Sequence, residues 1–261
     1  MGTRSGPSLS GGRDTDRRRL ILSAAALSLS APAIARSQAR LAPQASATAT
    51  YDYVFMETAT ANGVSWREPL VAHLTARRAA LQAAGGEVVG LFAPQLGWRS
   101  HEAALLVRWT GPRADRRVLD GLLRTPLVSR FTREPLTPTV RPGASERPAV
   151  GGIYVHRWFE VAARDVPEFV DLSVQGWRDF EVRFDTRIFG LFTAALTATE
   201  RREGRSRLLL LTRYASHGVW EQSRDPSTEA MAMFRRRQQL TRTSGGSSTT
   251  LVPLPGLHQG A

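Results

Sequence analysis

Residues 187–197 read RIFGLFTAALT, and residues 87–96 read EVVGLFAPQL. The triplet Gly-Leu-Phe therefore occurs twice, 100 residues apart, within stretches rich in the residues that favour strands. Other landmarks recur at a similar spacing: Pro69 and Pro167, Arg108-Trp109 and Arg213-Tyr214, and Pro126 and Pro226. This near-constant offset predicts an internal repeat, the alternative being a chance coincidence of common residues.

Each copy of the repeat is predicted to run strand, helix, strand, strand, helix, strand. The first copy has predicted strands at 51–60, 87–96, 102–110 and 137–141 and helices at 66–84 and 115–131. The second has strands at 153–161, 187–197, 206–215 and 248–254 and helices at 165–184 and 227–241. This βαββαβ order is the ferredoxin-like motif, whose sheet carries helices on one face only. We therefore expect an α+β fold in which two tandem ferredoxin-like modules pack sheet to sheet as a pseudo-dimeric α/β barrel.

The modules are assigned to residues 51–141 and 153–255. A linker that contains Pro, Gly and Ser joins them at 142–152. Small polar residues predict a flexible lead-in at 36–50, and a loose tail is expected at 256–261.

Residues 1–35 have the order of a signal peptide. Arg17-Arg18-Arg19 precedes an apolar run to Ala31, and Ala33-Ile34-Ala35 is a small-residue cleavage site. The adjacent arginines predict twin-arginine export, with an ordinary Sec signal as the alternative. Cleavage after Ala35 would leave a periplasmic or secreted protein. The apolar run is shorter than the roughly 20 residues that cross a bilayer, and no later stretch is expected to span one.

Composition excludes several kinds of chemistry. The chain has 261 residues and a formal net charge of +12, with arginine as its only strong base and no cysteine. Thiolate metal sites, cysteine nucleophiles, Schiff-base lysines and P-loop lysines are therefore absent. The arginines are scattered without aromatic interleaving, so no nucleic-acid partner is expected. No histidine pair has metal-ligand spacing and no glycine-rich phosphate loop follows a strand, so neither a metal nor a cofactor is expected.

The second copy resembles the NIPSNAP family. The resemblance rests on the opening strand Ile153–Phe159 (IYVHRWF), on Gly190-Leu191-Phe192, and on Arg207–Tyr214 (RLLLLTRY) followed by Trp220-Glu221 and Arg224-Asp225-Pro226. It covers most of residues 150–255 and, more weakly, 51–141, and His156 stands where the family usually has an apolar residue. It implies the dimeric α/β-barrel fold, which the family shares with small cofactor-free monooxygenases and haem-dependent relatives. The family has no agreed activity, so the resemblance implies a fold and no mechanism.

Candidate site residues come from the first strand of each copy. An offset of 98 to 100 residues puts Glu57 and Arg157 on equivalent strand faces, and a charge packed against helices is costly. We therefore expect both to point into the barrel, with Arg108 and Arg213 reaching the same ligand site from the third strands. The alternative is a salt-bridged barrel core, or charges exposed at strand ends. His156 is expected on the opposite face.

Two functional classes remain open. The first is a binding protein whose barrel holds a small anionic or aromatic ligand, or a protein partner, in the cell envelope. The second is a cofactor-free monooxygenase-type enzyme acting on a small aromatic substrate, for which Glu57 or His156 is the candidate general base. A cavity containing either residue would favour the enzyme, whereas a barrel filled with side chains would favour a structural role. The sequence leaves the oligomeric state open.

Overall fold

The computed structural model describes residues 49–59, 65–111 and 115–257. The chain divides into two units, 1–40 and 41–261, and all described residues belong to the second. The predicted signal peptide and nearly all of the lead-in lie outside the described residues, as does most of the tail. No helix in these ranges is both long enough and apolar enough to cross a membrane.

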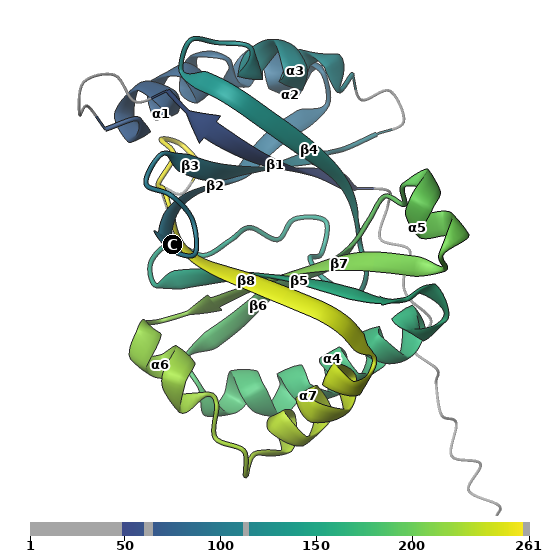
Figure 1. The fold of residues 1–261 in the computed structure, drawn as a ribbon. Helices are drawn as coiled ribbons and strands as arrows, with labels where there is room; N and C mark the ends of the chain where they lie inside the picture. The colour runs from purple at the N-terminus through teal and green to yellow at the C-terminus, as the bar shows by residue number, and fades with distance from the viewer. Residues whose placement is uncertain (1–48, 60–64, 112–114, 258–261) are drawn as a thin grey trace, which may run out of the picture. The chain divides into compact units, whose positions relative to one another are not determined.

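The described strands form a closed barrel in the order β1-β3-β2-β8-β5-β7-β6-β4 (Figure 1). Every neighbouring pair is antiparallel, so β4-β1-β3-β2 and β8-β5-β7-β6 are two ferredoxin-like sheets joined at their edges. The predicted fold class is thereby confirmed. The strands are β1 (Thr50–Thr58), β2 (Gly86–Leu96), β3 (Glu102–Trp109), β4 (Val128–Pro138), β5 (Ile153–Ala162), β6 (Thr186–Ala194), β7 (Arg205–Tyr214) and β8 (Thr241–Leu251).

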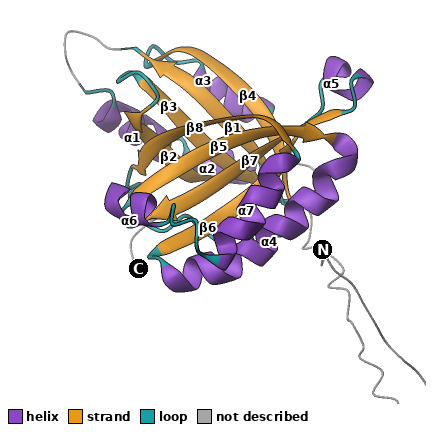
Figure 2. Ribbon diagram, turned by 60° about the horizontal axis from the view of Figure 1, so that its bottom comes forward, coloured by secondary structure: helices purple, strands orange, loops and turns teal. Residues whose placement is uncertain are grey.

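The helices cover the outside of the barrel, as Figures 1 and 2 show. Helices α1 to α3 lie over the first sheet, while α4 and α7 pack side by side over the second. The bounds are α1 (Arg67–Ala76), α2 (Arg78–Ala83), α3 (Arg117–Leu123), α4 (Val166–Arg183), α5 (Ala198–Arg202), α6 (His217–Gln222) and α7 (Glu229–Gln239), with a short 3₁₀ turn at Ala163–Asp165.

Alternation along the strands divides the core into three layers. On β1, Val54 and Met56 pack against the helices of the first half, whereas Tyr51 and Tyr53 point into the barrel. On β5, Val155 and its outward neighbours pack against α4 and α7. The barrel interior is aromatic and aliphatic; its buried members include Tyr51, Tyr53, Phe92, Leu106, Tyr154, Phe189, Phe192, Leu209 and Leu211.

The repeated Gly-Leu-Phe triplet marks a bulge that both halves share. The register of β2 against β3 shifts at Gly90, and the register of β6 against β7 shifts at Gly190. A Cβ atom on either glycine would lie 2.7–2.8 Å from the ring of Phe92 or Phe192, two residues along the strand. The triplet is therefore a packing unit, in which only glycine leaves room for the ring.

Three predicted element boundaries are wrong by seven residues or more. The helix predicted at 115–131 ends at Leu123, and β4 begins at Val128 rather than at 137, because Pro126 cannot continue a helix. The last strand begins at Thr241 rather than at 248, although its TRTSGGSSTTL sequence is typical of a loop. Pairing with β5 over nearly its whole length holds it extended, so tertiary contacts override local propensity.

Candidate functional site

The structure places Arg157 and His156 on the faces opposite to those predicted. Tyr154, His156 and Trp158 face the barrel interior, and Arg157 lies on the outer face with Val155. The cause is the offset between the first strands. Gly90 and Gly190 pair with Leu106 and Leu211, which in turn pair with Tyr53 and His156, so equivalent positions of the first strands lie 103 residues apart. An odd offset reverses the face that an even offset of 98 to 100 predicts.

Glu57 and Arg157 consequently do not meet. Glu57 lies at the end of β1, where its carboxylate pairs with the exposed Arg130 of β4. The matching position on β5 is Glu160, which accepts a hydrogen bond from Arg205 at 2.6 Å. The expectation that Arg157 points into the barrel beside Glu57 is therefore wrong, because Arg157 lies on the outer face and Glu57 pairs with Arg130 at the rim. A role of either residue in ligand binding stays a prediction.

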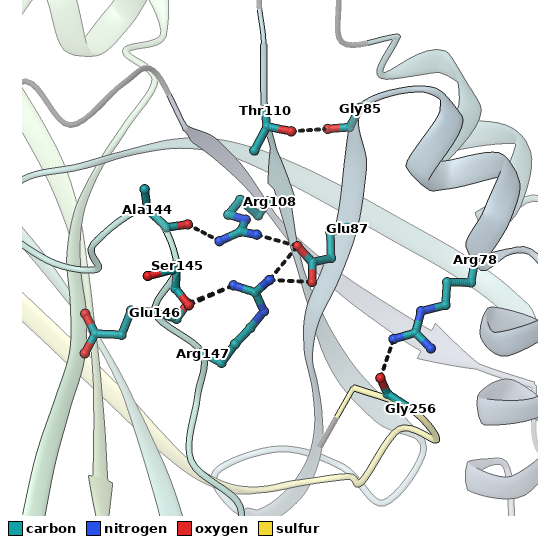
Figure 3. Close-up of polar contacts among 10 residues, drawn as sticks. All are labelled: Arg78, Gly85, Glu87, Arg108, Thr110, Ala144, Ser145, Glu146, Arg147 and Gly256. Atoms are coloured by element: carbon teal, nitrogen blue, oxygen red, sulfur yellow. Dashed lines mark hydrogen bonds and ion pairs between the residues drawn. The ribbon is translucent and has the colours of Figure 1, made fainter. Parts of the chain in front are cut away.

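Arg108 bonds the linker at one end of the barrel. We call this end of the barrel the linker end. The Glu87 carboxylate accepts from Arg108 Nη2 at 2.5 Å and from Arg147 Nη2 at 2.7 and 2.9 Å (Figure 3). Arg108 also donates to the backbone oxygen of Ala144. Because Ala144 and Arg147 belong to the linker, these bonds hold the linker against β2 and β3.

Arg213, the counterpart of Arg108, has the same kind of position. Its Nε donates to the Gly151 oxygen at 3.0 Å, and its Nη1 pairs with Asp185 at 3.1 Å. Nearby, the Tyr154 hydroxyl donates to the Ala149 oxygen at 2.7 Å. Both Nη atoms of Arg108, and the Nε and Nη1 atoms of Arg213, thus bond the chain itself, whereas Arg108 Nε is buried without a hydrogen-bond partner among the described residues. The contact of either arginine with a ligand stays a prediction.

The opposite end of the barrel holds a cavity of about 360 Å³, and we call it the cavity end. Its walls come from the inward faces of β1, β4, β5, β7 and β8 and from the loop after β2. The lining residues are Tyr53, Phe55, Gly97, Trp98, Thr132, Glu134, His156, Trp158, Arg207, Gly245, Gly246 and Ser247. This volume lies in the range of small-molecule sites.

Aromatic rings dominate the walls of the cavity. The rings of Phe55 and Trp98 meet edge to face at a centroid distance of 5.3 Å, and Trp98 stands 5.2 Å from His156 in the same way. Trp158 lies 5.7 Å from Tyr53. Such T-shaped contacts fix the rings against one another, so the cavity has preformed apolar walls.

His156 forms the floor of the cavity and has a partner on each ring nitrogen. Its Nδ1 lies 2.9 Å from the Tyr53 hydroxyl and its Nε2 lies 2.9 Å from Oγ1 of Thr249. Thr249 in turn donates to the Tyr154 oxygen at 3.2 Å. The arrangement that satisfies every group has Tyr53 donating to Nδ1 and a proton on Nε2 that is donated to Thr249.

Burial lowers the pKa of His156 to about 3, because the protonated ring would lose its hydration. The imidazole is therefore neutral at ordinary pH, and burial also raises the pKa of Tyr53. With both nitrogens engaged, His156 offers no free lone pair to a metal ion. Nor does any group of three or more acidic or histidine side chains in the described ranges lie close enough to hold one.

The charges around the cavity are already paired. Arg207 donates to Glu134 at 3.0 Å and also bonds Glu200, and its guanidinium lies 5.9 Å from the Trp158 ring centroid. The cavity therefore presents hydroxyl groups and aromatic faces without an uncompensated charge. This balance suits a neutral aromatic molecule better than an anion.

The sequence indicates His156 as a candidate general base but places it on the other face of its strand, and it does not identify the remaining walls of this cavity. Aromatic residues at every second position, Tyr51-x-Tyr53-x-Phe55 on β1 and Tyr154-x-His156-x-Trp158 on β5, carry the signal that could have identified the inner face. Trp98 lies in the loop between β2 and β3, where no periodicity applies.

No protein-family model matches the chain, and no curated protein matches it. Among solved structures, the chlorite dismutase of Candidatus Nitrospira defluvii in complex with imidazole is similar, with a TM-score of 0.52 and 9% identity over 81% of this chain and 94% of that one. The chain has the dimeric α/β-barrel fold. An anthrone oxidase-like protein matches with a TM-score of 0.49 and 13% identity, over 78% of this chain and 92% of that one. A heme-binding protein from Thermus thermophilus matches with a TM-score of 0.47 and 10% identity, over 80% and 94%.

Proposed function

We propose that this chain is an exported NIPSNAP-like α/β-barrel protein that binds a small, neutral aromatic molecule at the cavity end of its barrel. The observation that carries the proposal is the cavity of about 360 Å³ walled by Phe55, Trp98 and Trp158 over a neutral His156. Export to the cell envelope is supported by the sequence of residues 1–35, and NIPSNAP membership by the motifs of the second copy.

Binding fits the site better than proton abstraction. A general base works best when its pKa lies near the operating pH, whereas the pKa of His156 is lowered to about 3 by burial. Its Nδ1 is also occupied by the Tyr53 hydroxyl. The Glu57 carboxylate lies outside the cavity lining and is paired with Arg130.

The second candidate function is a cofactor-free monooxygenase-type enzyme. It is favoured by the placement of the hydrogen-bonded Tyr53 and His156 on the floor of an aromatic cavity. In that case a bound phenol would share its proton with this pair, and oxygen would be consumed. Oxygen-electrode measurements with small phenols separate the two functions, because a binding protein consumes none.

A pair of glycine variants tests the binding site. Gly245 lies opposite Trp158 in the β5–β8 register, so a side chain there would point into the cavity. A Cβ atom at Gly245 has no described atom within 4 Å, and the same is true of the exposed Gly121 on α3. We expect native mass spectrometry of the exported protein, with 1-naphthol added, to show one bound molecule in wild type and G121L and none in G245L. Equal occupancy in G245L would contradict the proposal.

A further inference from the structure

Arg157 is a half-buried guanidinium that lacks an acidic partner in the part of the chain the structure describes. It makes no hydrogen bond, ion pair or ring contact there. Other strand arginines are paired: Arg205 with Glu160 at 2.6 Å and Arg213 with Asp185 at 3.1 Å. A cation held against a helix layer without a counter-charge is costly, so its retention calls for an explanation.

Two further arginines increase this cost. Arg237 on α7 is buried against the rings of Phe159, Phe169 and Phe234, and its Nη1 donates to Ser173 at 3.1 Å. Burial, followed by the charge of Arg157, lowers the pKa of Arg237 to about 9. Arg224 stacks on Trp220 at 4.5 Å and also repels Arg157. Three like charges therefore converge, and none has a carboxylate partner among the described residues.

A cavity of about 480 Å³ opens beside Arg157 on the outer face of the second sheet, and we call it the outer cavity. Its apolar walls are Leu96, Ile153, Val155 and Trp220, and serines of β8 supply hydroxyl groups. His217 also lines it, with Nε2 3.3 Å from the Ser248 hydroxyl. The strand segment around Gly245 and Gly246 separates the outer cavity from the cavity inside the barrel and lines both.

We propose that the outer cavity is a second ligand site, which takes an aliphatic carboxylic acid with its carboxylate on Arg157 and its chain against Ile153, Val155 and Trp220. The planar fork of a guanidinium matches a carboxylate with two parallel hydrogen bonds. Bound acid would supply the negative charge that Arg157 lacks and would thereby offset its repulsion by Arg224 and Arg237, which line a small neighbouring pocket and not the outer cavity itself. The site is independent of the barrel cavity, where Arg207 is already neutralised by Glu134 and Glu200.

The test measures decanoate binding by isothermal titration calorimetry, with decanol and sulfate as probes that lack the charge or the chain. Arg157→Gln removes the anchor, and R236Q on the exposed side of α7 is its matched control with the same loss of charge. Gly246 lies opposite Arg157 in the β5–β8 register, so Gly246→Leu fills the outer cavity, whereas G245L fills the barrel cavity.

We expect one decanoate per chain, with affinity lowered roughly 10- to 100-fold in R157Q and G246L and unchanged in R236Q and G245L. The ligand-free melting temperature of R157Q should stay the same or rise, because an unpaired cation is removed. Wild-type affinity in R157Q or G246L would overturn the proposal. So would decanol binding as tightly as decanoate, or a loss of decanoate binding in G245L alone.

Discussion

The two ends of the barrel are built from the same strands and differ in what closes them. At the linker end, Glu87 bonds both Arg108 and Arg147, and the linker also bonds Tyr154 and Arg213 of the second half. At the cavity end, the ion pairs Glu57–Arg130 and Glu134–Arg207 stand at the rim, and a cavity remains between them. Pseudo-symmetric strands therefore give one end that is filled by the chain itself and one that can receive a molecule.

This difference separates charges that hold the fold from charges that border a site. The Arg108 side chain is 9% exposed and both of its Nη atoms bond atoms of the chain, whereas the Arg130 side chain is 70% exposed. Desolvation makes the first kind of pair sensitive to the loss of a partner, and water screens the second.

The largest effect is expected from E87Q at the linker end. Removing the carboxylate leaves Arg108 buried beside Arg147 without a counter-charge, so the free energy of unfolding should fall by about 2–4 kcal/mol. Urea unfolding at neutral pH measures this change. A loss of the size expected for an exposed ion pair would show that the linker network does not hold the barrel closed.

The next effect concerns the pH dependence that His156 brings to the cavity end. Its folded pKa is lowered to about 3, so below about pH 6.5 the unfolded chain takes up a proton that the folded chain does not. The free energy of unfolding should therefore fall as pH falls from about 6.5 to about 3, by up to about 1.4 kcal/mol per pH unit. Above about pH 6.5 the ring is neutral in both the folded and the unfolded chain, so His156 adds no pH dependence to the free energy of unfolding there.

Comparison with H156Q separates the effect of His156 on the pH dependence of stability from the effect of the carboxylates. Between about pH 7 and pH 5, wild type should lose about 2 kcal/mol more than the variant, as followed by urea unfolding at each pH. Parallel pH profiles for the two proteins would mean that His156 is not held neutral.

A smaller effect is expected from Y53F. The variant keeps the ring but removes the hydroxyl that donates to His156 Nδ1, leaving a buried acceptor without a partner. The free energy of unfolding should fall by about 1–2 kcal/mol. Thermal unfolding of Y53F measures this change. The control is F55Y, which adds a hydroxyl at the neighbouring inward position. Unchanged stability in Y53F would contradict the hydrogen bond from Tyr53 to His156.

The smallest effect is expected from E57Q at the rim. Its partner Arg130 is largely exposed, so the substitution should change the free energy of unfolding by only about 0–1 kcal/mol. Measured beside E87Q, it compares the same chemical change at the two ends. Equal losses in the two variants would remove the distinction between them.

The fold class could be predicted from the sequence because the residues that recur in both copies are residues with a role in packing. Gly90 and Gly190 open matching bulges for Phe92 and Phe192, and such constraints survive in both copies. The inner face could not be assigned from the same landmarks. The connection from first strand to first helix is longer in the first copy, residues 59–66, than in the second, 163–165, so landmarks on the helices misplace the strands by an odd number of residues.

The candidate site was only partly predictable for a related reason. His156 was recognised as unusual, but its neutral state depends on Tyr53 and Thr249, which the barrel brings together from distant strands. Arg157 was recognised as a candidate for ligand binding, and the structure moves it to a different cavity. Residue type could be judged from sequence, whereas the partners of each residue depend on strand register.

The cavity end of the barrel is proposed here as a binding site for a small aromatic molecule. Calorimetric titration of 1-naphthol into wild type, G245L and G246L tests it most directly, because these neighbouring glycines face the barrel cavity and the outer cavity respectively. We predict that G245L weakens binding at least about tenfold, which corresponds to about 1.4 kcal/mol, and that G246L binds as wild type does. Wild-type affinity in G245L, or a loss confined to G246L, would contradict it.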